Sequence, residues 1–337
     1  MRLKSIQQNK KCKTQINTNN RKAVYVMKYY VRKILTLIIT LLCILLLTFT
    51  AFSVIPGDAA VSRLGMDATD EEIEQLREYY GLNDSIPVRF VKYVSGVVKG
   101  DFGISTQYSK PVSTLMAQRL PVTIWLAVIS MLLIIVISVP VGLICAKKPG
   151  GVFDRIIIFI NQIFMAVPAF FLGMIICIVF GVMLSWFVPG RYTAPSAGFI
   201  KFLGYMIFPA ISIALPKIAM TVKFLRSSVL REYGLDYVRT AKSKGNSETG
   251  ILVRHVLKNA LIPVITFLGM ILADILAGSI VAEQVFNLPG VGRLLVNAIS
   301  NRDYPVVQAS VIYIASLVLI INFIVDIMYK KLDPRVK

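Results

Sequence analysis

The sequence predicts an all-α integral membrane protein with six transmembrane helices, a large outer loop and a hydrophilic loop between the fourth and fifth spans. Two observations carry this prediction. The mean hydropathy is +0.69 and 56% of the residues are hydrophobic, which is too apolar for a typical soluble domain. In addition, the apolar residues form blocks with almost no charge. Each block can cross a hydrocarbon core about 30 Å thick, which takes about 20 helical residues.

Each apolar block is expected to form one membrane span. The first, second and sixth blocks are uncharged runs, whereas the fourth is bracketed by Lys201 and Lys217 and the fifth is interrupted by Asp274. Acids inside a bilayer tend to face a cavity or another helix, so Asp274 is a candidate for a translocation path. The expected spans are 34–55, 122–146, 156–187, 202–222, 263–282 and 304–327.

The third apolar run, 156–190, is long enough to be taken for two spans, because its 35 uncharged residues would make a helix about 50 Å long. Two spans would place the basic segment 223–262 outside the cell. We therefore predict one helix, tilted or kinked at Pro168, followed by an outer turn at Pro189 and Gly190.

The distribution of charge predicts the orientation. The segments assigned to the inside hold 25 Lys/Arg and 5 Asp/Glu, whereas those assigned to the outside hold 10 and 11. Because cytoplasmic loops carry an excess of Lys and Arg, we expect a multi-pass protein of the cell membrane with both termini in the cytoplasm. The net charge of +19 is then mostly a consequence of topology. No nucleic-acid partner is expected, because no basic groove with interleaved aromatic residues accompanies it.

Residues 1–26 differ from the rest of the chain. They are rich in Lys, Asn and Gln and poor in apolar residues, which predicts a disordered basic extension. Basic residues follow Met27 directly before the first span, as at a natural amino terminus. We therefore hypothesise that translation begins at Met27 rather than Met1, with the membrane domain at 27–337. An intact mass of the natively expressed protein that included residues 1–26 would contradict this.

The counts of cysteine and histidine argue against an enzyme. The four cysteines are far apart, and His255 is the only histidine, so neither a zinc-protease motif nor a Ser-His-Asp triad can be assembled. The dipeptide Gly-Lys is absent, which excludes a phosphate-binding GxxxxGK[ST] loop. We expect no catalytic, cofactor or metal site in this chain. If ATP drives it, another chain binds the ATP.

The hydrophilic segment 223–262 is expected to form two helices. The stretch from Asp236 to Gly245 predicts a helix that stops at the glycine, and 247–261 predicts a second helix closed by Pro263. Ala241 and Gly245 lie one turn apart, where the absence of large side chains permits close approach of another helix. That helix could belong to a soluble partner or to the chain's own second helix.

Several separated motifs, taken together, resemble those of one known family, the permease subunits of binding-protein-dependent ABC importers of the oligopeptide, dipeptide and nickel group. The resemblance extends from about Met27 to the end of the chain. In order, the motifs are Ile55-Pro-Gly-Asp58, Tyr80-Gly-Leu-Asn-Asp-Ser-Ile-Pro87, Gly100-Asp-Phe-Gly-Ile-Ser105, Arg119-Leu-Pro-Val-Thr123, Asp236-Tyr-Val-Arg-Thr-Ala-Lys-Ser-Lys-Gly245, Arg254-His-Val-Leu-Lys-Asn-Ala-Leu-Ile-Pro263, Glu283-Gln-Val-Phe-Asn-Leu-Pro-Gly-Val-Gly-Arg293, Arg302-Asp-Tyr-Pro305 and Asp333-Pro-Arg335.

The resemblance implies a transmembrane permease that moves di- or oligopeptides into the cytoplasm by alternating access. Its expected partners are a second, similar permease, two cytosolic ABC ATPases that hold the ATP, an external substrate-binding protein and membrane lipid. The loop before the fifth span resembles the family's coupling helix, which sits in a groove of the ATPase, although Arg239 stands where the broader family has an acid. The residues assigned to this ATPase-coupling loop are Asp236, Tyr237, Arg239, Ala241, Lys242, Gly245, Arg254, Asn259 and Pro263.

Three alternatives remain open from the sequence. Within the family, the substrate could be a nickel chelate rather than a peptide. In another class, the chain could be an ion-coupled secondary transporter, although such proteins usually carry several buried ionisable residues. The outer loop 56–121, with a helix expected to start at Thr69, could receive the binding protein or could cap the helix bundle as a solvated loop.

Overall fold

The computed structural model of the chain describes residues 2–54, 69–79 and 84–332. Within these ranges the protein is almost entirely helical, and the only β contact is an isolated bridge between Ile104 and Pro111. The motifs at 55–58 and 333–335, and the first residues of the motif at 80–87, lie outside the described residues. The predicted all-α membrane fold is confirmed.

Helix α1 spans Arg2–Val54, and its portion Met27–Ser53 is apolar enough to cross a membrane. Residues 1–47 form a unit of their own. The helix includes the basic segment 2–26, for which we had predicted disorder. Lys, Arg and Gln are good helix formers, and a helix satisfies its backbone hydrogen bonds without needing a packed core.

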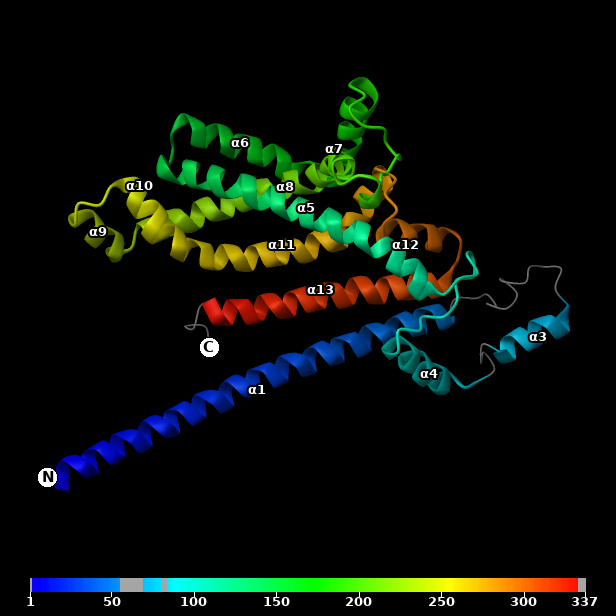
Figure 1. Cartoon of the computed structure of the whole chain (residues 1–337), viewed down its shortest axis with the longest axis horizontal. Coiled ribbons are helices and arrows are strands. Elements are labelled where there is room, and N and C mark those ends of the chain that lie inside the picture. The colour runs from blue at the N-terminus through cyan, green and yellow to red at the C-terminus, as the bar shows by residue number, and fades with distance from the viewer. Residues whose placement is uncertain (1, 55–68, 80–83, 333–337) are drawn as a thin grey trace. The chain divides into compact units, whose positions relative to one another are not determined.

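Four long helices form the main bundle, as Figure 1 shows: α5 (Val112–Lys147), α8 (Phe199–Tyr233), α11 (Leu257–Val285) and α13 (Tyr304–Leu332). Helix α8 packs against α5 and α11, and α11 packs against α13. All four are longer than the roughly 20 residues that cross a hydrocarbon core. Together with the first helix, they provide five of the six predicted spans.

The third predicted span is broken rather than kinked. Helix α6 (Val152–Ala166) and helix α7 (Ala169–Ile176), which continues as a π-helix over Cys177–Met183, meet at 98°. Val167 is extended, with φ −87° and ψ 124°, because the ring of Pro168 disfavours helical geometry in the preceding residue. The break lies at Pro168, where we had allowed for a kink, but the bend is sharper than a kink. The pair is either a broken span or a re-entrant element, so a single span over 156–187 stays a prediction.

We had predicted that the second helix of the hydrophilic loop ends at Pro263, but it does not. It runs from α10 (Glu248–Ile251) through a π-helix (Leu252–Val256) directly into α11, which has Pro263 in its interior. Pro263 has no N–H for the Asn259 carbonyl, one turn earlier in the helix. Beside this point, the Ser228 hydroxyl of α8 donates to the Ala260 carbonyl at 3.0 Å and holds the two helices together. The fifth span is thus continuous with the loop.

Short helices lie at both ends of the bundle (Figure 1). Helices α9 (Asp236–Ser243) and α10 lie at the end where α8 finishes, and α12 (Val291–Ser300) lies at the opposite end. The outer loop contains α3 (Asp70–Tyr79) and α4 (Ile86–Val98). Helix α3 begins where we expected, because the Glu72 carboxylate accepts the Thr69 backbone N–H at 3.0 Å and the Thr69 hydroxyl accepts the Glu72 N–H at 3.4 Å, which is a capping box.

Candidate functional site

The connection between α8 and α11 contains the predicted helix–glycine–helix unit. Helix α9 ends at Ser243, and Gly245 adopts a left-handed conformation with φ +78°, which residues with a Cβ rarely adopt. The Gly245 N–H donates to the Lys242 carbonyl at 2.9 Å, and the Asn246 side-chain amide donates to the Ala241 carbonyl at 3.1 Å. The predicted stop at glycine is therefore confirmed: Gly245 is the left-handed residue that follows the C-cap residue Lys244.

Ala241 does not offer a surface for a partner. Its side chain is 7% exposed and belongs, with Val238, to the apolar core that also contains Ile251, Leu252 and Val256. Helix α9 therefore packs through its small and apolar face against the chain's own second helix, which is the self-packing alternative. We no longer place Ala241 among the residues that contact a partner. Gly245, in contrast, has no heavy atom within 4 Å of a Cβ built on it.

Tyr237 fastens α9 to both long helices. Its hydroxyl donates to the Glu232 carboxylate, near the end of α8, at 2.9 Å. It also lies close to the side chain of Asn259 at the start of α11. Burial raises the pKa of Tyr237 above its ordinary value, so the phenol stays protonated and can donate. The two predicted residues Tyr237 and Asn259 are thus brought together, and a displacement of α9 would act on both helices.

The solvent-exposed surface of the segment between α8 and α11 is basic and partly apolar. Leu235 and Val253 are 45% and 52% exposed. Asp236 is exposed and lies 3.6 Å from Arg239, a pair too solvated to contribute much to stability. The exposed cations of this segment are Arg239, Lys242, Lys244, Arg254 and Lys258. We call these five residues, together with Leu235 and Val253, the loop surface. Exposed apolar groups surrounded by mostly positive charge are typical of a protein-binding surface.

Asp274 lies in the interior of α11, with its side chain 59% exposed, and forms an ion pair with Lys217 of α8. The sequence had identified the acid but not its partner, because the two residues lie on different helices. Pro263, the last residue of the predicted loop set, lies near the start of the same helix. The ion pair lies in the middle of two spans and is exposed on one side. The face of the bundle that contains it is therefore expected to contact more than lipid.

A second acid on α11, Glu283, is completely buried and was not predicted as a site residue. Its carboxylate accepts the Thr123 hydroxyl of α5 at 2.7 Å and the Arg293 backbone N–H of α12 at 3.0 Å. The same hydroxyl accepts the Val291 N–H at 3.0 Å. A Cβ at Gly290 would overlap the carboxylate. Glu283 therefore caps the first turn of α12 and ties it to α5 and α11.

Asp303 is likewise completely buried and joins two motifs that are far apart in sequence. It hydrogen-bonds the Ser105 hydroxyl and accepts the backbone N–H groups of Thr106 at 3.1 Å and Gln107 at 3.4 Å. The outer loop is thereby held to the corner between α12 and α13. Both buried acids lie in motifs that contain glycine or proline next to apolar runs, which is the one feature of the sequence that could have identified them.

No cluster of three His, Cys, Asp or Glu residues that could hold a metal ion occurs within the described part of the chain. The described residues therefore form two polar surfaces, the loop surface and the Lys217–Asp274 pair. The buried acids Glu283 and Asp303 lie at the end of the bundle that carries α12. Such groups can bind a partner and transmit movement.

Comparison with known proteins finds similar sequences over nearly the whole chain. The family described as binding-protein-dependent transport system inner membrane component matches residues 138–337, and its N-terminal component matches residues 26–127. Three relatives each align over 92% of this chain and 99% of their own length. They are the probable peptide ABC transporter permease protein y4tP of Sinorhizobium fredii (36% identical), the oligopeptide transport system permease protein AppB of Bacillus subtilis (38%) and the glutathione transport system permease protein GsiC of Escherichia coli (36%).

The capping role of Glu283 is testable by amide hydrogen exchange. In Glu283→Gln an amide NH₂ replaces one acceptor oxygen, so a buried N–H group at the start of α12 loses its acceptor, which costs about 1–3 kcal/mol. We expect the amides of residues 291–295 to exchange at least about fivefold faster. The control is Glu248→Gln, which makes the same substitution at an exposed position. Equal exchange in the two variants would contradict the assignment.

Proposed function

Because the chain belongs to the family of binding-protein-dependent transport system inner membrane components, we propose that it moves di- or oligopeptides into the cytoplasm as the permease subunit of an ABC importer. The observation that carries this proposal is the set of relatives named for peptides, oligopeptides and glutathione, at 36–38% identity over 92% of the chain. A permease of this kind is not itself an enzyme. The energy comes from ATP that partner subunits hydrolyse.

The complex contains, besides this chain, a second similar permease, two cytosolic ATPases and an external substrate-binding protein. Both termini and the loop surface face the cytoplasm, since the excess of Lys and Arg lies on that side. ATP binding and hydrolysis on the partners shift the helix bundle between inward-open and outward-open states, which is a population shift between two conformations. The nickel chelate remains the alternative substrate within the family.

The loop surface docks onto an ATPase. Its cations pair with acidic groups of the partner, and Leu235 and Val253 enter an apolar part of the groove. The fastening of α9 by Tyr237 to Glu232 and Asn259 supports this proposal, because a force on α9 acts on the ends of α8 and α11 together. Gly245 contributes by letting the chain turn sharply between α9 and α10.

The Lys217–Asp274 pair lines the translocation path. A peptide carries a charge of each sign at its termini, and a pair of opposite charges in the path provides a partner for both without trapping either. The exposure of Asp274, 59% against 22% for Lys217, supports this position. The other role open to such a pair is a purely structural link between α8 and α11.

The substrate is tested by uptake in a strain that lacks this chain and in the complemented parent. We expect the deletion to abolish uptake of a labelled tetrapeptide and to leave uptake of labelled nickel with a chelator unchanged. Loss of nickel uptake alone would assign the chain to the metal-transporting branch. Peptide uptake that an uncoupler abolishes while cellular ATP is held constant would instead indicate a secondary transporter.

Docking of the loop surface is tested by reversing charge at two exposed positions. In Lys244→Glu with Arg254→Glu, repulsion replaces attraction at the ATPase, so we expect the amount of ATPase that co-purifies to fall by about tenfold or more, with a weaker dependence on salt. Arg191→Glu with Lys201→Glu reverses two exposed charges at and just before the start of α8, away from the loop surface, and should leave co-purification intact. Unchanged association in the double variant would refute docking through these cations.

The role of the ion pair is tested by removing one charge or both. Asp274→Asn leaves Lys217 without its counter-charge, and we expect peptide uptake to fall by about tenfold at normal expression. Replacing a buried or half-buried pair with apolar residues of similar size is often neutral for stability. The double variant Lys217→Met with Asp274→Leu should therefore fold normally yet remain defective in uptake. Restored uptake in the double variant would show that the pair is only a structural link.

A further inference from the structure

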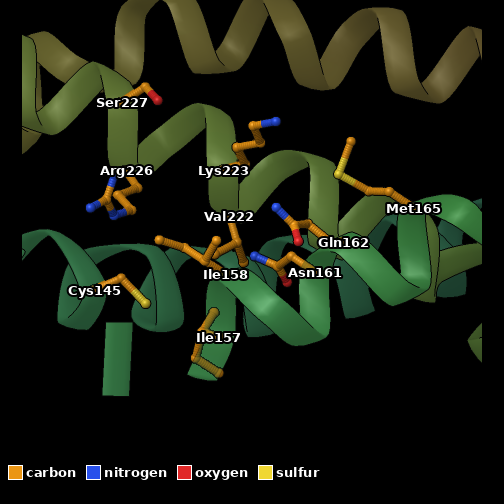
Figure 2. A pocket seen from close by; sticks show the side chains of 10 residues that line it. All are labelled: Cys145, Ile157, Ile158, Asn161, Gln162, Met165, Val222, Lys223, Arg226 and Ser227. Atoms are coloured by element: carbon orange, nitrogen blue, oxygen red, sulfur yellow. The ribbon is translucent and has the colours of Figure 1, made fainter. Parts of the chain in front are cut away.

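A cavity of about 130 Å³ lies between α5, α6 and α8, away from the ion pair and from the loop surface. Figure 2 shows its side chains, with Ile158 and Val222 between Arg226 and the amides of Asn161 and Gln162. The volume is several times the roughly 30 Å³ that one water molecule occupies in the liquid. The cavity can therefore hold a group of several heavy atoms.

The polar part of the cavity is held rigidly. The Asp154 carboxylate, 1% exposed, accepts from Arg226 Nε at 2.6 Å and Nη2 at 2.7 Å, and it also accepts the Gly150 N–H at 2.7 Å. This bidentate pair uses two of the five guanidinium N–H donors. It keeps Arg226 in one orientation at the edge of the cavity. Asn161 is 8% exposed and supplies amide N–H donors from α6.

The cavity and its surroundings carry a positive charge. Asp154 neutralises Arg226, but Lys223 lines the cavity as well and is exposed. The end of α5, the following loop and the first turn of α6 add three more exposed cations, Lys147, Lys148 and Arg155. No acid other than Asp154 lies in the segment 145–165. An anion is therefore the complementary ligand.

The remaining lining residues are those expected around a lipid chain. Ile157, Ile158, Met165 and Val222 are apolar, and they continue from the polar groups along helices that cross the membrane. Ile158 and Met165 are 37% and 42% exposed, so the cavity opens toward the side of the bundle. Basic pockets between transmembrane helices, with apolar walls below, suit anionic lipid headgroups.

We propose that this cavity binds one anionic phospholipid, with the headgroup phosphate held by Lys223 and the amides of Asn161 and Gln162, while Arg226 lies at the other edge of the cavity. The part of an acyl chain nearest to the headgroup contacts Ile158 and Met165. The lipid bridges α6 to α8 at the place where α6 leads to the 98° break. The site is independent of the peptide substrate and of the ATPase-docking surface.

Native mass spectrometry of the whole permease complex in detergent, with phosphatidylglycerol and phosphatidylcholine added in equal amounts, tests the proposal. The wild type should retain one phosphatidylglycerol in preference to phosphatidylcholine. Lys223→Ala should reduce that preference by about fivefold, since a lysine at an anionic surface is worth about a factor of that size. Lys201→Ala removes the same charge from the opposite end of α8 and should leave the preference unchanged.

A second variant separates the cavity from diffuse surface charge. Ile158→Trp fills the cavity without changing any charge and should abolish the preference for phosphatidylglycerol. If Ile158→Trp retains the preference, or if Lys223→Ala and Lys201→Ala behave alike, the proposed site is wrong. Displacement of the lipid by inorganic phosphate, at an ionic strength matched with chloride, would show a site for the free ion and would equally overturn the proposal.

Discussion

The contact between α8 and α11 is the constraint on which the rest of the bundle depends. Polar side chains join the two helices at three levels: Ser228 donates to the Ala260 carbonyl at one end, Lys217 pairs with Asp274 in the middle, and the Tyr205 hydroxyl donates to the Phe286 carbonyl at 2.8 Å at the other end. Lipid tails are as apolar as leucine, so apolar burial alone gives helices little reason to associate. These polar links, and the close packing between them, specify how the two helices align.

This alignment connects the two ends of the protein. At one end, Tyr237 fastens α9 to α8 and α11. At the other end, Glu283 at the end of α11 caps α12 and holds it against Thr123 of α5. A movement that begins at the loop surface therefore reaches α12 through continuous helix and hydrogen bonds rather than through flexible connections. Such continuity is what a protein needs if ATP hydrolysis on a partner is to change access on the far side of the membrane.

The buried acids show how polar groups are tolerated in this fold. Glu283 and Asp303 are each completely buried, and each accepts several hydrogen bonds from backbone N–H groups and a hydroxyl. An unpaired buried carboxylate would be costly, whereas one that satisfies the amides of a helix start or a turn stabilises both partners. Both acids lie at the end of the bundle that carries α12, where the chain must turn sharply. They hold turns that apolar packing alone would leave undefined.

The sequence by itself determined the fold class, the place of five apolar helices along the chain, the glycine stop of α9 and the family. These features depend on local properties: apolar block length, propensity and the conformational freedom of glycine. The tertiary structure decided what depends on pairs of residues far apart. It placed Ala241 in the core instead of on a partner surface, paired Asp274 with Lys217, and buried Glu283 under Gly290. It also decided whether each of two prolines interrupts its helix. Pro168 lies at a 98° break, whereas Pro263 is accommodated within α11. A proline's effect depends on how neighbouring helices pack around it, and the order of residues along one helix does not contain that information.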